Sequence, residues 1–289
     1  MWFALALLRW LSQREYSKLL RWGRALGNGA RRLPLPQKRV VRRNLELCFP
    51  EWSEAARERV YRAHFCDAGI TLCETALAWF ASKERLLSLA KFDGLEALDA
   101  ERRAGRGVIL LAAHFTTLEI GARFATAIRD VHAVYKPSKN PLLTEFFRRY
   151  RGAVSAGMIA SDDIRSMVKV LRAGGVVWYA PDQAFRGKGA ESVDFFGIGA
   201  ATNTATSRLA QLTGAVVMPY FVERLPGIEG YQVSIGPALQ NFPSGDSVAD
   251  TRRHHELIEA AIKKLPSQYL WLHKRFKSIS NDEPDPYRR

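Results

Sequence analysis

Short apolar runs rich in valine, isoleucine and leucine recur along the chain after residue 107, and they constrain its fold more than any other feature. Runs of this length and composition, bounded by glycine or proline, are typical of buried strands. Helical stretches separate most of them, and strands that alternate with helices favour an α/β fold. We therefore predict a central, mostly parallel or mixed sheet flanked by helices, with strands at 108–113, 131–135, 176–180, 216–222 and 231–235.

The length of 289 residues suits one large domain, because the chain contains no internal repeat, low-complexity tract or Gly/Ser-rich linker. We expect residues 34–289 to form this domain and residues 1–33 to form a distinct N-terminal segment. The cysteines Cys48, Cys66 and Cys73 are odd in number and lack metal-finger spacing. They are interpreted as core residues of a protein in a reducing compartment.

The N-terminal segment opens with the apolar run MWFALALLRWL, which Arg9 interrupts. The run is far shorter than the ~20 residues that a membrane-spanning helix needs, and it lacks the charged leader and cleavage site of a signal peptide. Apolar residues continue at helical spacing as far as Leu26, interspersed with arginines. This pattern predicts a membrane-docking amphipathic helix within residues 1–33 that lies among the lipid headgroups. The same helix could instead pack on the protein's own core.

The charge balance is strongly basic: 43 Lys and Arg residues against 29 Asp and Glu residues give a net charge of +14. Such a charge indicates an anionic partner, which could be nucleic acid, an anionic membrane or an acidic protein. One cationic cluster, at Lys38, Arg39, Arg42 and Arg43, follows the N-terminal segment. It is either an ordinary solvated face or part of a surface for the same membrane.

His114 follows the apolar run at 108–113, and Glu119 lies at the start of a helix that we expect near 117–128. Ligands of open α/β sheets bind at such strand-to-helix corners. Five positions rotate a side chain by about 140° around a helix, so the two side chains meet only if His114 lies in the turn and folds back. A carboxylate on one imidazole nitrogen would leave the other nitrogen to take a proton from a hydroxyl. The alternative is an unrelated histidine and helical glutamate.

Polar residues also follow two other predicted strands: Lys136 comes after one, and Asp182 and Gln183 come after another. If these strands are parallel neighbours, all three side chains converge near His114. Asp182 could instead be a turn or cap residue, which is the commoner use of a lone aspartate in a loop.

Other catalytic signatures are missing from the sequence. The chain contains no metalloprotease, CxxC, nucleophile-elbow, phosphate-loop or dinucleotide motif. His254 and His255 are predicted to be surface histidines, because adjacent helical positions point about 100° apart and do not form a joint metal site.

Longer motifs point to a family. They are RRNLELCFPEWS at 42–53, HFTTLE at 114–119, YKPSKNP at 135–141, WYAPDQAFRGKG at 178–189, VDFFGIGAATNTATSRLAQLTGA at 193–215 and QYLWLHKRFK at 268–277. Together, in this order and over nearly the whole chain, they resemble the late acyltransferases of lipid A biosynthesis, the lauroyl/myristoyl acyltransferase family. The resemblance implies a glycerolipid-acyltransferase-like α/β domain without cofactor or metal. The chain departs from the family after Gln183, where Ala184 and Phe185 follow, and in its N-terminus, which resembles a shortened hydrophobic anchor.

The family's activity is transfer of a fatty acyl group from acyl carrier protein to the hydroxyl of an acyl chain on a lipid A precursor. The resemblance implies that His114 removes the hydroxyl proton and that Glu119 orients His114. The attack creates an oxyanion, which needs a donor or a cation already in place. Arg165 is the candidate for that role, and Asp182 for a site-organising carboxylate. Either residue could instead belong to an internal ion pair.

Both substrates carry anionic groups, since lipid A precursors are phosphorylated and acyl carrier protein is acidic. Residues expected to bind these substrates are Lys136, Lys139, Gln183, Arg186, Lys188, Lys274 and Arg275. Arginines offer forked contacts to phosphate. The resemblance also implies a monotopic or briefly anchored enzyme on the cytoplasmic face of the inner membrane, with no nucleic acid as partner.

Two alternatives compete with this hypothesis. A related membrane acyltransferase could use the same residues on another glycolipid or on a lysophospholipid. A basic module that binds nucleic acid or a membrane surface without catalysis is the other, although the aromatic residues are scattered and no nucleic-acid-reading motif occurs.

Overall fold

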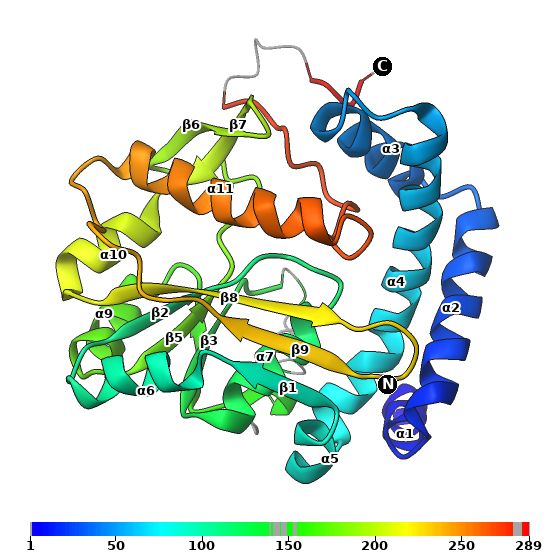
Figure 1. Ribbon diagram of the computed structural model, residues 1–289, viewed down its shortest axis with the longest axis horizontal. Coiled ribbons are helices and arrows are strands. Elements are labelled where there is room, and N and C mark those ends of the chain that lie inside the picture. The colour runs from blue at the N-terminus through cyan, green and yellow to red at the C-terminus, as the bar shows by residue number, and fades with distance from the viewer. Residues whose placement is uncertain are drawn as a thin grey trace.

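A seven-stranded sheet with the strand order β1-β9-β8-β2-β5-β3-β4 forms the centre of the protein (Figure 1). The computed structural model describes residues 2–138, 140, 145, 149–152, 155–279 and 285–288. The strands of this sheet are β1 (Ala90–Asp93), β2 (Val108–Leu111), β3 (Val131–Tyr135), β4 (Gly157–Ala160), β5 (Val176–Tyr179), β8 (Val216–Arg224) and β9 (Tyr231–Ile235). All neighbours pair in parallel except β8 and β9, which pair antiparallel.

The mostly parallel, mixed sheet confirms the predicted α/β fold, and every predicted strand is present. Three further elements were not predicted: β1, β4 and a separate hairpin of β6 (Ala190–Phe195) and β7 (Ile198–Asn203). These strands are short or only half-buried, so their residues alternate with exposed ones and do not form the continuous apolar runs of central parallel strands.

Helices surround the sheet. They are α1 (Trp2–Ser12), α2 (Tyr16–Arg32), α3 (Gln37–Cys48), α4 (Glu54–Phe80), α5 (Lys83–Leu87), α6 (Leu95–Arg103), α7 (Leu118–Ile128), α9 (Ile164–Arg172), α10 (Ala205–Thr213) and α11 (Ser247–Lys264). Alternate residues of β2 divide the core into two layers, because successive strand side chains point to opposite faces. Val108 and Leu110 pack with α2, α4, α6 and α7, whereas Ile109 and Leu111 pack with α9 and α10.

The N-terminal segment forms two helices, α1 and α2, and not the single docking helix expected within 1–33. The apolar face of α2 is buried in the core, where Leu19 and Leu20 pack with α4. Gly23 and Gly27 allow this close crossing, since a Cβ atom at Gly27 would lie 1.9 Å from the carbonyl oxygen of Phe65 on α4. This face of α2 therefore packs on the protein, as the alternative stated. Within the described residues, no helix is both long and apolar enough to cross a membrane.

The prediction that His254 and His255 lie on the surface is wrong. Both histidines, on α11, are 2% exposed, because the ring of His255 packs against Phe195 of β6 and the ring of His254 packs against Phe242 in the loop before α11. The ring of His255 donates a hydrogen bond from Nδ1 to the carbonyl oxygen of Asp194 at 2.6 Å. Burial lowers the pKa of His254 to about 4 and that of His255 to about 3, so both rings are neutral at physiological pH.

Candidate active site

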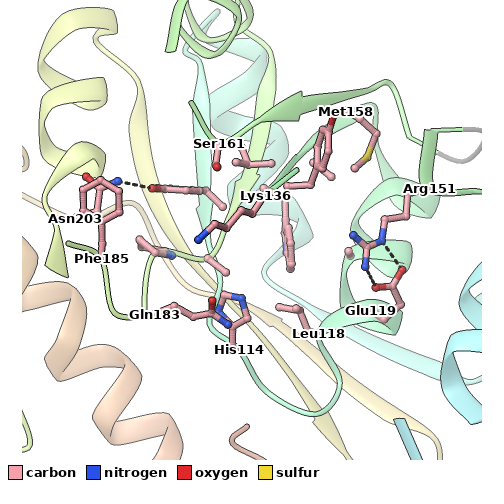
Figure 2. A pocket seen from close by; sticks show the side chains of 18 of the residues that line it. His114, Leu118, Glu119, Lys136, Arg151, Met158, Ser161, Gln183, Phe185 and Asn203 are labelled. Carbon is pink, nitrogen blue, oxygen red and sulfur yellow. Dashed lines mark hydrogen bonds and ion pairs between the residues drawn. The ribbon is translucent and has the colours of Figure 1, made fainter. Parts of the chain in front are cut away.

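A cavity of about 360 Å³ opens at the carboxyl ends of the parallel strands (Figure 2). Loops that follow the strands contribute most of its polar lining, Glu119 of α7 and Arg151 add to it, and α7 and the sheet contribute apolar side chains. The residues that line the cavity include His114, Leu118, Glu119, Ala122, Lys136, Arg151, Met158, Ser161, Trp178, Gln183 and Asn203. The cavity therefore occupies the position at which open α/β sheets bind their ligands.

His114 and Asp182 form a hydrogen-bonded pair at the floor of this cavity. His114 lies in the turn between β2 and α7, and its Nδ1 is 2.6 Å from Oδ1 of Asp182, which follows β5. The backbone N–H of His114 donates to the other carboxylate oxygen at 2.9 Å, as does the hydroxyl of Tyr269. Because an ionised carboxylate only accepts hydrogen bonds, His114 carries its proton on Nδ1 and leaves Nε2 as a proton acceptor.

Asp182 is fully buried, whereas the side chain of His114 is 18% exposed. Burial alone would raise the pKa of Asp182, but the neighbouring charge of His114 and the hydrogen bonds from its ring and backbone hold that pKa below its usual value. The carboxylate consequently stays ionised over the whole physiological range. A fixed negative charge therefore lies 2.6 Å from Nδ1 of His114.

The expectation that Glu119 orients His114 is wrong in geometry. The carboxylate of Glu119 accepts two hydrogen bonds from Arg151, at 2.8 and 2.5 Å, and one from the indole of Trp79 at 2.6 Å. None of the hydrogen bonds among the described residues joins it to His114. Figure 2 shows Glu119 and Arg151 facing each other at one side of the cavity, away from the histidine. Glu119 lies in the first turn of α7, and His114 turns to Asp182 and not back over the helix.

Lys136 and Gln183 line the cavity near His114, and Asp182 binds the histidine directly. The three side chains therefore come together as the parallel strands predicted, while their chemical roles stay predictions. Figure 2 shows the ammonium group of Lys136 reaching into the middle of the cavity. Within the described residues, this group makes no hydrogen bond or ion pair.

Four of the other predicted site residues lie outside the cavity. Arg165 is exposed near the start of α9, and Arg186 and Lys188 are exposed on the loop after β5. Lys274 lies on another surface, where its Nζ is 3.8 Å from Oδ2 of Asp285. Lys139 lies outside the described residues.

Arg275 is buried, and the expectation that it binds a substrate anion is wrong. Only 1% of Arg275 is exposed, and its guanidinium donates to the carbonyl oxygen of Ala201 and to the hydroxyl of Thr202. Burial lowers the pKa of Arg275, although the neighbouring Tyr269 and Asp182 oppose this effect. Arg275 holds the C-terminal segment against β7 and contributes to the core.

Sequence reasoning missed several residues of the site. Tyr269 and His273 lie in the segment QYLWLHKRFK, which is part of the family resemblance, but neither residue was assigned a role. The rings of His273 and His114 have centroids 6.5 Å apart, and burial lowers the pKa of His273 to about 4. Trp79 and Arg151, which hold Glu119, follow no predicted strand and carry no local motif.

The cavity combines a histidine held by a buried carboxylate, a lysine and an apolar wall. Groups of this kind can activate a hydroxyl for attack on an acyl group. Residues 1–278 match the sequence profile of the family described as bacterial lipid A biosynthesis acyltransferase. The chain therefore belongs to this family and is an acyltransferase.

Individual relatives agree with this assignment. The chain is 34% identical to the lipid A biosynthesis lauroyltransferase of Escherichia coli (strain K12) over 287 residues, which cover 99% of this chain and 94% of the relative. It is 33% identical, with the same coverage, to the lipid A biosynthesis palmitoleoyltransferase of that organism. The lipid A biosynthesis myristoyltransferase of the same strain is 29% identical over 269 residues, covering 91% and 82% of the two chains. These similarities exclude a binding module without catalytic activity.

Proposed function

We propose that this enzyme transfers a fatty acyl group from acyl carrier protein to the hydroxyl of an acyl chain on a lipid A precursor. Family membership supports the reaction type and the acceptor class. The observation that carries the mechanism is the His114–Asp182 pair, which leaves Nε2 of His114 as a proton acceptor beside the cavity.

In the proposed mechanism, Nε2 of His114 takes the proton of the acceptor hydroxyl while the hydroxyl oxygen attacks the thioester carbonyl carbon. Asp182 stabilises the imidazolium by its fixed charge. When the tetrahedral intermediate collapses, the carbon–sulfur bond breaks and the imidazolium returns its proton to the thiolate of the carrier. The products are a new ester and a free carrier thiol, and no acyl-enzyme is needed.

Lys136 replaces Arg165 as the residue proposed to stabilise the oxyanion. Lys136 lines the cavity with His114, whereas Arg165 does not. An ammonium group that is already in place and has no competing ion pair among the described residues can meet the negative charge as it develops.

Glu119 is proposed as a positioning residue that acts through Arg151. The indole of Trp79 donates a hydrogen bond to Glu119 and steadies its carboxylate, which accepts two hydrogen bonds from the guanidinium of Arg151 and so fixes Arg151 at the cavity wall. A forked guanidinium at the wall is suited to an anionic group of the acceptor. Leu118, Ala122, Met158 and Trp178 form an apolar part of the cavity wall. We propose that the acyl chain lies against this part of the wall.

The N-terminal segment, which forms α1 and α2, is proposed to dock on the cytoplasmic face of the inner membrane. Its exposed apolar side chains include Leu7, Trp10, Trp22 and Leu26, which are 45%, 46%, 36% and 53% exposed. The two tryptophan rings stack with centroids 5.6 Å apart. Tryptophan, leucine and interspersed arginines are the residues that amphipathic helices place at a lipid interface.

The test is transfer in vitro from acylated acyl carrier protein to a purified lipid A precursor, with the product identified by mass spectrometry. His114→Ala should lower kcat by about 10²- to 10⁴-fold, the usual contribution of a general base. His132→Ala, a histidine on β3 outside the cavity, is the matched control. A wild-type enzyme that acylates only another glycolipid or a lysophospholipid would refute the acceptor, and an active His114→Ala variant would refute the base.

A further inference from the structure

α9 and α10 both begin at the edge of the sheet that holds the cavity. α9 precedes β5 and α10 precedes β8, and both of these strands run parallel to β2. The two helices therefore run alongside each other, away from the carboxyl ends of the strands. Ser161 and Asn203, which come shortly before α9 and α10, line the cavity itself (Figure 2). The N-terminal ends of α9 and α10 consequently lie beside the cavity, and their outer faces extend from it along the sheet.

These outer faces and the loop beside them are rich in exposed cations. They are Arg165, Lys169 and Arg172 on α9, Arg208 on α10, and Arg186 and Lys188 on the neighbouring loop, and we call the exposed face of α9 and α10 the α9–α10 surface. Arg172 donates to the carbonyl oxygen of Leu212, which ties the two helices together. The carboxylates at the start of α9 are Asp162 and Asp163, and Asp163 is occupied as the N-cap of that helix.

Apolar side chains are exposed among these cations. Ile164 on α9 is 40% exposed and Leu212 on α10 is 56% exposed. Within the described residues, Lys169 and Arg208 make no hydrogen bond or ion pair. A surface that presents unpaired cations around exposed leucine and isoleucine side chains complements an acidic protein surface with apolar residues of its own.

The α9–α10 surface lies on the opposite face of the sheet from the helices proposed to meet the membrane. α9 and α10 cover the face formed by Ile109 and Leu111, whereas α2 and α4 pack in the layer of Val108 and Leu110. The apolar cavity residues Trp178 and Met158 also belong to the membrane-side layer, and Figure 1 places α9 and α10 away from α1 and α2. A soluble partner can therefore approach this surface while the protein is docked on lipid.

We propose that the α9–α10 surface docks the acidic acyl carrier protein and that the thioester-bearing arm enters the cavity between Ser161 and Asn203. The proposal rests on the proposed function for the identity of the donor. It assigns the two substrates to different sides of the sheet, with the lipid acceptor entering from the α4 and α7 side.

Charge reversal tests this assignment. The variant Lys169→Glu/Arg208→Glu changes the surface without touching the cavity, and Lys91→Glu/Arg103→Glu makes the same change of charge at exposed positions of β1 and α6. Each protein is assayed with acylated acyl carrier protein and with S-acyl pantetheine, which carries the same thioester but no protein. Binding to vesicles that contain anionic phospholipid is measured in parallel.

The expected result is a fall of about tenfold or more in kcat/KM for the carrier-bound donor, mainly through KM, with weaker dependence on salt. Turnover of S-acyl pantetheine should stay at the wild-type rate, and the control variant should match the wild type with both donors. Unchanged kcat/KM for the carrier in Lys169→Glu/Arg208→Glu, an equal loss in both double variants, or a loss confined to vesicle binding would each overturn the docking surface. A wild-type enzyme that does not use the carrier at all would instead overturn the proposed donor.

Discussion

Replacing Asp182 with asparagine tests whether Asp182, and not Glu119, is the carboxylate that orients His114. The ring of His114 donates from Nδ1 to Asp182 at 2.6 Å, which leaves Nε2 as the base. An asparagine amide is neutral and can turn its N–H₂ group toward Nδ1, which then accepts and forces the proton onto Nε2. That tautomer cannot take a proton from the substrate. We therefore expect Asp182→Asn to keep the substrates bound and to stop the chemistry.

The expected loss in kcat is about 10³- to 10⁴-fold, by analogy with the equivalent change in serine proteases. At 1.36 kcal/mol for each factor of ten, this corresponds to about 4 to 5.5 kcal/mol of transition-state stabilisation. Stability should also fall, because the buried carboxylate accepts hydrogen bonds from the backbone and ring of His114 and from Tyr269. A net value of about 1.5 to 3 kcal/mol for a hydrogen bond to a charged group sets the scale of that loss.

The measurement is single-turnover transfer at a temperature well below the unfolding midpoint of every variant, with Glu119→Gln as the comparison. Glutamine keeps the shape of Glu119 but weakens its hold on Arg151, so we expect a smaller loss in kcat and a rise in KM for the lipid acceptor. Near wild-type turnover in Asp182→Asn, together with an inactive but folded Glu119→Gln variant, would refute the assignment of Asp182 as the orienting carboxylate.

Further predictions concern the cavity, the membrane and acid stability. Lys136→Met should lower kcat by about 10²- to 10³-fold with little change in KM, and a raised KM with an unchanged kcat in steady-state kinetics would refute an oxyanion role. Trp10→Ser/Trp22→Ser should weaken sedimentation with anionic vesicles but leave turnover of detergent-dispersed substrate unchanged; undiminished sedimentation would contradict the docking surface. Burial lowers the pKa of His64 and of His254 to about 4, so the unfolded chain binds more protons and stability falls as the pH drops from about 6.5 to about 4. Roughly 3 kcal/mol is at stake for each histidine, and a flat free energy of unfolding across this range would refute the effect.

The central strands were predictable because parallel strands are buried on both faces and read as continuous apolar runs. Val108 to Leu111 is fully buried along its length, and so is Val176 to Tyr179. The edge strands β1 and β4 alternate with exposed or half-buried residues and therefore left no such signal. The amphipathic pattern of α2 was recognised, but amphipathicity states only that one face is buried and not whether protein or lipid covers it.

The site was predictable where its residues follow strands, and not elsewhere. Parallel neighbours bring the carboxyl ends of β2, β3 and β5 together, and this alone places Lys136 and Asp182 near His114. The sequence did not predict the partner of Glu119, because Arg151 follows no predicted strand and meets Glu119 only through the tertiary fold. Arg275 shows the opposite error, since charge alone does not reveal that a guanidinium is buried.

The spacing of His114 and Glu119 acquires a different meaning from this geometry. His114 lies in the loop between β2 and α7, and Glu119 lies in the first helical turn of α7. Both side chains face the same cavity from different sides. The loop therefore sets the separation between the base and the Glu119–Arg151 pair, which lies at one side of the cavity (Figure 2). The five-residue spacing then serves to hold a cavity wall at a fixed place relative to the base, and it does so without any contact between the two side chains.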